Sequence, residues 1–125
     1  MINNVQEVHT NFVEAVTAPP EQYTGDRDFD SILQQCRNIL RVKGHDYVGS
    51  SPDRLANFNS AAKVLGQTPE SVLGVYLWKH LNAIFTYLQK GQLESESIEG
   101  RIVDSINYLL LLSKMVAEKK HNTHP

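Results

Sequence analysis

Several features that mark common functional classes are scarce in this sequence of 125 residues. Cys36 is its only cysteine, so the chain can form neither an intrachain disulfide nor a thiolate metal cluster. The longest uninterrupted apolar run, Tyr108 to Leu112, is far too short to span a membrane. Its 12 Lys and Arg residues are balanced by 14 Asp and Glu, without the concentrated positive charge of a duplex-binding protein. We therefore expect neither a membrane nor a nucleic-acid duplex as a partner.

The N-terminal stretch MINNVQEVHTNF lacks the basic and apolar regions of a signal peptide, which predicts a cytoplasmic protein. The length suits one domain with one core. We expect an N-terminal helix and linker over residues 1–28, a helical domain over 29–118 and a disordered tail over 119–125.

Apolar residues recur at helical spacing in five segments, and no segment alternates with the period of a strand. The expected helices cover residues 2–17, 29–42, 52–65, 68–90 and 97–118, and residues 45–51 are expected to form a loop. Prolines and glycines mark several boundaries, among them Gly44, Pro52, Gly66 and Gly91. The predicted fold class is all-α. Cys36 lies among apolar neighbours at helical spacing, which favours a buried structural residue over a reactive thiol.

The last expected helix carries a polar stripe that ordinary core packing does not explain. Asp104, Asn107 and Tyr108 share one side at steps of three and four residues, and Arg101 borders that side. We expect the core on the other side, formed by Ile102, Val103, Ile106, Leu109 and Leu110. Burying Asp104 and Asn107 without partners costs several kcal/mol, so the stripe indicates a binding site. The alternative is a surface pair of Arg101 with Asp104 beside a capped asparagine.

The helix over residues 68–90 has a comparable pattern. Lys79 and Asn82 lie on one side of it, and His80 falls beside Tyr76 and Tyr87, where a histidine is either a ligand contact or a core residue with satisfied hydrogen bonds. No Asp or Glu occurs from residue 71 to residue 92, so this helix can supply no carboxylate to a metal. A third polar group, Asp46 with Tyr47, lies in the stretch KGHDYVGSSPDRLANF, where the aspartate alternatively only caps the loop.

Four segments resemble the phage-encoded branch of the MazG-like all-α nucleoside triphosphate pyrophosphohydrolases: KGHDY at 43–47, NF at 57–58, KHLNAI at 79–84 and ESIEGRIVDSINYLLLL at 96–112. The resemblance covers about residues 30–117. It implies a helical bundle completed by dimerisation or higher assembly. It also implies a nucleotide between the helices, with its phosphates on Mg²⁺ held by Glu-x-x-Glu and Glu-x-x-Asp motifs.

The resemblance carries over to Asp104, which matches the final aspartate of the second motif, and to Asn107 and Tyr108. Arg101 and Lys79 stand where relatives place acids. Because Mg²⁺ requires oxygen ligands, these replacements remove ligands and add cations that can meet phosphates directly. If a metal is bound, the remaining acids that could hold it are Asp104, Asp46 and Glu99.

The favoured prediction is a non-hydrolytic protein that sequesters a small-molecule nucleotide, for instance a defence signal, in the cytoplasm of an infected bacterial host. The expected ligand-binding residues are Lys79, His80, Asn82, Arg101, Asp104, Asn107, Tyr108, Asp46 and Tyr47. One alternative is a Mg²⁺-dependent pyrophosphohydrolase of (deoxy)nucleoside triphosphates, and another is a helical interaction module with a vestigial site. A homo-oligomer is expected because the apolar surface of the last two helices exceeds what one chain can cover, in particular Tyr76, Trp78, Tyr87, Leu110 and Leu112.

Overall fold

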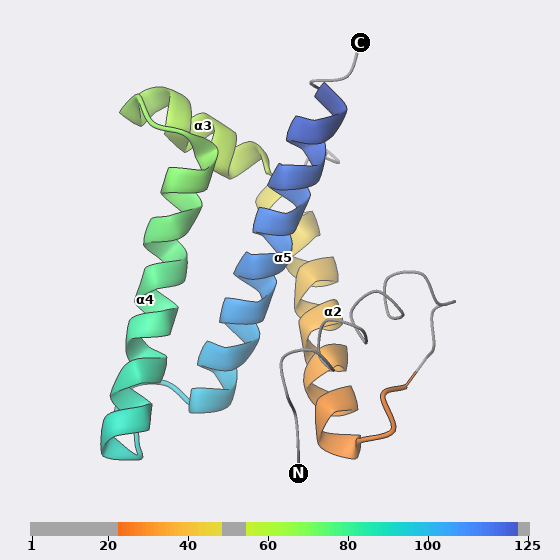
Figure 1. Ribbon diagram of the computed structural model, residues 1–125, viewed down its shortest axis with the longest axis vertical. Coiled ribbons are helices and arrows are strands. Elements are labelled where there is room, and N and C mark those ends of the chain that lie inside the picture. The colour runs from red at the N-terminus through yellow and green to blue at the C-terminus, as the bar shows by residue number, and fades with distance from the viewer. Residues whose placement is uncertain (1–22, 49–54, 123–125) are drawn as a thin grey trace, which may run out of the picture. The chain divides into compact units, whose positions relative to one another are not determined.

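The described part of the chain is all-helical. In a computed structural model, residues 23–48 and 55–122 are described, with side chains described for 23–42 and 55–121. They form α2 (Arg27–Val48), α3 (Ala56–Leu65), α4 (Pro69–Lys90) and α5 (Ile98–Asn122), and these residues contain no strand (Figure 1). The all-α prediction is confirmed at this level, whereas the helix expected over residues 2–17 lies outside the described residues. No helix in the described ranges combines the length and apolar character needed to cross a membrane.

The chain divides into two compact units, residues 1–30 and residues 31–125. In the first unit, α2 begins at Arg27 because Asp26 caps it: its Oδ1 accepts hydrogen bonds from the backbone N–H groups of Asp28 (2.9 Å) and Phe29 (3.0 Å). Such a cap satisfies amide donors that have no partner within the helix. The helix therefore starts two residues earlier than the apolar pattern predicts.

In the second unit, α2 continues through Gly44 to Val48, so the loop predicted from residue 45 is wrong as far as residue 48. A glycine weakens a helix interior by about 1 kcal/mol but removes no hydrogen-bond donor, so it need not end a helix. The next helix, α3, begins at Ala56 with Leu55 before it, four residues later than expected, and Pro52 itself lies outside the described residues.

The boundaries of α4 agree with the sequence prediction. The hydroxyl of Thr68 accepts a hydrogen bond from the Ser71 N–H at 3.1 Å, and Pro69 occupies the first turn. At the other end, Gly91 has a φ of 78°, in the left-handed region, and its N–H donates to the Tyr87 carbonyl at 2.7 Å. Only glycine enters this region without a steric penalty, so Gly91 defines the end of the helix.

Helix α5 follows α4 after a short connection and lies against it, while α3 contacts α4 (Figure 1). It continues to Asn122, so residues 119–122 are helical where a disordered tail was expected. Within this last turn, the Lys119 ammonium pairs with Glu70 of α4 at 3.0 Å. This contact connects the end of α5 to the beginning of α4.

The core of the second unit contains Leu55, Leu73 and Met115, with side chains of α3, α4 and α5 packed around them. The expectation for the core side of α5 is largely wrong: Val103 is buried, but Ile102, Leu109 and Leu110 are exposed. Instead, α5 turns the side with Arg101 and Ser105 inward, together with Met115. A helix that is apolar on most sides can satisfy its burial requirement in more than one orientation, and here its contact with α4 decides the outcome.

Candidate functional site

Four of the side chains predicted on α4 and α5 meet where these two helices pack: His80, Arg101, Asp104 and Tyr108. We define the α4–α5 polar cluster as His80, Glu96, Arg101, Asp104 and Tyr108. Arg101 Nη1 lies 3.1 Å from His80 Nδ1, which is itself 3.7 Å from Asp104 Oδ2. On its other side, Arg101 Nε lies 3.1 Å from Glu96 Oε2. Only 10% of the Arg101 side chain and 12% of the His80 side chain are exposed, so the guanidinium and the imidazole are buried while the two carboxylates reach the solvent.

The contact with Arg101 fixes the protonation of His80. A guanidinium only donates hydrogen bonds, so Nδ1 of His80 must accept, which requires a neutral imidazole with its proton on Nε2. The pKa of His80 is lowered from its ordinary value, chiefly by burial, and the positive charges of Arg101 and Lys79 lower it further. The Asp104 carboxylate acts in the opposite direction and raises this pKa, as does Glu96 more weakly.

The Arg101 guanidinium is held by its neighbours but not saturated by them. Its Nε is within ion-pair distance of Glu96, yet the geometry does not qualify as a hydrogen bond, and this buried donor has no hydrogen-bond partner among the described residues. The Glu96 carboxylate holds this donor by charge alone, so an oxyanion ligand with better hydrogen-bond geometry could replace it.

Aromatic rings form one wall of the cluster. The Tyr108 ring stacks on His80 with centroids 5.4 Å apart, and lies parallel to Tyr76 at 6.1 Å with an interplanar angle of 5°. Phe58 of α3 packs edge-on against both tyrosines. Since Tyr76 is exposed, the aromatic wall extends from the buried cluster to the surface.

The other predicted site residues lie at different depths. Lys79 and Asn82 are exposed on α4, although the charge of Lys79 acts on His80. Asn107 is only 6% exposed, and neither its Nδ2 nor its Oδ1 has a hydrogen-bond partner among the described residues. Glu99 is exposed in the first turn of α5.

Asp46 and Tyr47 belong to the helical backbone of α2, and their side chains lie outside the description. The metal set proposed from sequence therefore cannot be assembled from described atoms. No three His, Cys, Asp or Glu side chains in the described ranges are grouped closely enough to hold a metal ion. Cys36 is buried and free, as expected, and burial raises the pKa of its thiol.

Two contributions to the cluster were not predicted from sequence. Glu96 was not among the expected ligand-binding residues, but here it pairs with Arg101. Ser105, which was not considered, donates to the Arg101 carbonyl at 2.8 Å and so needs no other partner. The five-residue step from Glu96 to Arg101 crosses the start of α5, so helical periodicity gives no signal for this pair.

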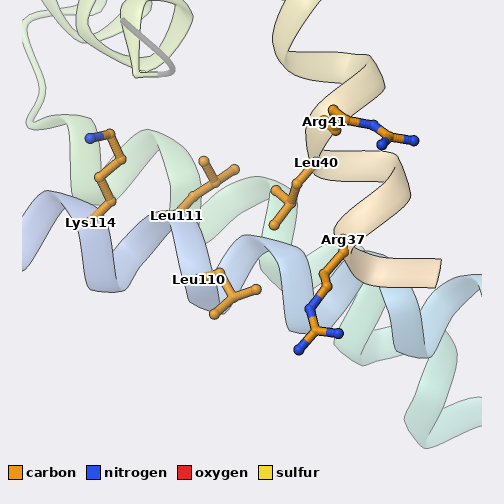
Figure 2. A pocket seen from close by; sticks show the side chains of 6 residues that line it. All are labelled: Arg37, Leu40, Arg41, Leu110, Leu111 and Lys114. Atoms are coloured by element: carbon orange, nitrogen blue, oxygen red, sulfur yellow. The ribbon is translucent and has the colours of Figure 1, made fainter. Parts of the chain in front are cut away.

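A second region with positive charge lies between α2 and α5. We define the α2–α5 pocket by its lining residues, which are Arg37, Leu40, Arg41, Leu110, Leu111 and Lys114, and it holds about 330 Å³ (Figure 2). Figure 2 shows Leu40 projecting from α2 toward α5, with Arg37 reaching along α5 and Arg41 directed outward at the rim. None of the residues predicted from sequence as ligand contacts lines this pocket.

These two regions offer different chemistry. The α4–α5 polar cluster combines a buried guanidinium, a neutral imidazole and an aromatic wall, which suits a phosphate attached to a planar group. The α2–α5 pocket combines exposed cations with leucine side chains, which suits an anion with an apolar body.

The chain was compared with protein-family models, with curated proteins and with solved structures, and it matches none of them.

Proposed function

We propose that this protein binds a nucleotide at the α4–α5 polar cluster and holds it without hydrolysis. The observation that carries the proposal is the buried Arg101 guanidinium, whose Nε faces only the half-exposed carboxylate of Glu96, which a phosphate could displace. A phosphate oxygen accepts charge-assisted hydrogen bonds from a guanidinium, often two in parallel. The neutral His80 leaves its Nε2–H as a further donor for the same group.

The aromatic wall supports the nucleoside part of the proposal. Tyr76 is exposed and parallel to Tyr108, so its outer face is open to a nucleobase. Stacking of a base on an aromatic side chain contributes about 1–3 kcal/mol and tolerates different bases. The proposal therefore assigns the phosphate to Arg101 and the base to the tyrosine side of the cluster.

The distribution of acids supports binding over hydrolysis. Helix α4 has no acid from residue 71 to its end, and Arg101 occupies the position where the resemblance implies a second metal-binding acid before Asp104. Hydrolysis of a phosphoanhydride on Mg²⁺ requires carboxylates that hold the metal and polarise the phosphate. The resemblance to MazG-like proteins also motivates the proposed role, which is sequestration of a nucleotide defence signal in the cytoplasm of an infected bacterial host.

The same resemblance motivates a homo-oligomeric MazG-like bundle as the functional form. An apolar surface on α4 favours self-association, because Val75, Trp78, Phe85 and Leu88 are all exposed there. On α5, Ile102, Leu109 and Leu110 add further exposed apolar area, while Tyr87 and Leu112 are partly covered within the chain. Light scattering at micromolar concentration is expected to give a multiple of 14.1 kDa, and a clean monomer mass contradicts this part of the proposal.

Incubation with a panel of linear and cyclic nucleotides, with Mg²⁺ or with EDTA, separates the candidate functions. Intact nucleotide retained by the protein, with little effect of EDTA, supports the sequestration proposal. Hydrolysis products that require Mg²⁺ support the pyrophosphohydrolase, and in that case Asp104→Asn abolishes turnover. Absence of both binding and hydrolysis leaves the helical interaction module.

Site variants locate the bound nucleotide. Arg101→Gln is expected to weaken binding by about 10- to 100-fold, the worth of a charge-assisted contact. Lys79→Ala is expected to weaken it only several-fold, because Lys79 is exposed. Lys63→Ala is the control, since Lys63 is an exposed lysine of α3, whereas Lys119 pairs with Glu70 and is unsuitable. Equal binding by all three variants places the nucleotide elsewhere.

A further inference from the structure

The α2–α5 pocket has a composition that the proposed nucleotide site does not use. Half of its lining is leucine and half is cationic, and no acid is among the six residues. Its volume of about 330 Å³ falls at the lower end of the range of small-molecule sites. The chain as a whole has a net charge of −2, so three cations in one lining, of which only Lys114 pairs with an acid, are a local concentration against the overall balance.

The two arginines of the pocket repel each other, and no carboxylate among the described residues relieves that repulsion. Arg37 and Arg41 are one turn apart on α2, where like charges disfavour each other. None of the ion pairs among the described residues involves either of them. Lys114, across the pocket on α5, pairs with Glu118 at 3.0 Å but stays partly exposed. An anion at the α2 rim of the pocket would be attracted chiefly by the two arginines, since Lys114 lies at the other end and is paired with Glu118 (Figure 2).

The apolar part of the pocket comes from both helices. Leu40 and Leu111 are half-buried, and 46% of Leu110 is exposed. Leucine surface beside cations favours a ligand whose body is apolar and whose end is charged, because each part then contacts matching groups.

Outside the pocket, a buried amide lies on the same stripe of α5 as its lining residues. Asn107 lies three, four and seven residues before Leu110, Leu111 and Lys114, so helical geometry puts all four on one stripe. Both polar atoms of its side chain lack a hydrogen-bond partner among the described residues, although only 6% of the residue is exposed. The stripe thus runs from a cation, past two leucines, to an unsatisfied polar group.

We propose that the α2–α5 pocket is a binding site for a small amphipathic anion, an aliphatic or aromatic body that ends in a carboxylate or phosphate. The charged end lies at the α2 rim beside Arg37 and Arg41, and the body covers Leu40, Leu110 and Leu111. This site is separate from the α4–α5 polar cluster and does not depend on nucleotide binding there.

Calorimetric titration of the full chain with decanoate, and in a second arm with decyl phosphate, tests the site below micelle-forming concentrations. The double variant Arg37→Gln/Arg41→Gln is expected to weaken binding about tenfold or more, as loss of charge-assisted contacts implies. Lys63→Gln/Lys90→Gln removes the same charge from exposed positions outside the pocket and is expected to change binding less than about twofold. The arm with the tighter ligand identifies the preferred head group.

A second pair of variants separates the pocket from other apolar surface. Leu110→Glu puts a negative charge into the pocket and is expected to abolish binding of both probes, whereas Leu109→Glu makes the same change at an equally exposed position outside it. Both residues are half exposed, so both variants should fold, which circular dichroism checks. No binding of either probe to the unmodified chain, or equal binding by Leu110→Glu and Leu109→Glu, overturns the proposal. Nucleotide binding lost in Arg101→Gln but kept in Leu110→Glu shows that the two sites are distinct.

Discussion

Arginines of this protein occur in two contrasting environments. Arg101 is buried between Glu96 and His80, in contact with side chains from α4 and from the connection before α5. Arg37 and Arg41 are exposed on α2 beside leucines, and no described carboxylate pairs with them. The buried guanidinium is held by its partners, whereas no ion pair among the described residues holds the exposed ones. The first environment suits a ligand of defined geometry, and the second suits a ligand recognised by charge and apolar area.

The contrast also separates binding from stability. A buried charge is held in a fixed orientation, which suits it to bind a ligand. Removing it leaves its partners unpaired and lowers the stability of the fold. An exposed charge can be removed with little effect on the fold. The same substitution made at a buried and at an exposed arginine therefore tests whether the two environments differ in this way.

The largest difference is expected for stability. Arg101→Ala leaves Glu96 and His80 without their partner and should lower the free energy of unfolding by about 2–4 kcal/mol, somewhat less than for a fully buried pair because Glu96 is 53% exposed. The same change at Arg37 should cost less than about 0.5 kcal/mol. Urea denaturation measures both. Equal effects would mean that Arg101 is not held by the contacts described.

Asn107→Leu should increase stability by about 1–2 kcal/mol, because it replaces a buried amide without a partner by an apolar group of similar size. Asn82→Leu is the matched control on the exposed side of α4 and should change stability little. Thermal unfolding compares the two variants. A fall in stability for Asn107→Leu would show that its amide has a partner outside the described residues.

Glu96→Gln tests the partner of Arg101 from the other side. Because Glu96 is half exposed, we expect a loss of about 1 kcal/mol or less. We also expect a several-fold gain in nucleotide affinity, since the carboxylate competes with phosphate for the same guanidinium. Glu94→Gln is the control: it removes the same charge from the same connection, and Glu94 itself takes part in none of the described ion pairs. If both variants bind alike, only net charge matters and Glu96 is not a competitor.

The smallest expected effect is a change in pH dependence. Burial lowers the pKa of His80 in the folded chain below about 6.5, its value when unfolded. As pH falls below that value, the unfolded state binds a proton that the folded state does not. The free energy of unfolding therefore decreases as pH is lowered, until the pH reaches the pKa of His80 in the folded chain. His80→Gln should flatten this part of the stability profile, and His121→Gln, at an exposed position, should not. Profiles that respond equally would contradict the burial of His80.

The sequence by itself determined the helical class, and in detail the helix that carries explicit end signals. Thr68, Pro69 and Gly91 define α4 because their effects act within one turn of the chain. The sequence also identified some of the polar residues that the fold brings together, since Asp104 and His80 lie among apolar neighbours at helical spacing. Gly44 misled the prediction because a glycine alone is a weak stop, and α2 continues beyond it.

Only the tertiary structure decided which side of α5 is buried and which partners Arg101 has. Periodicity gives the angle between side chains on one helix, but it does not give the direction in which a neighbouring helix lies. Ile102 and Leu110 fit a buried face as well as Met115 does, so their exposure follows from the packing of α5 on α4. The pairing of Glu96 with Arg101 likewise depends on the path of the connection before α5, and the α2–α5 pocket exists only because two helices distant in sequence lie together. Local propensities act over a few residues, whereas burial is a property of the whole packed chain.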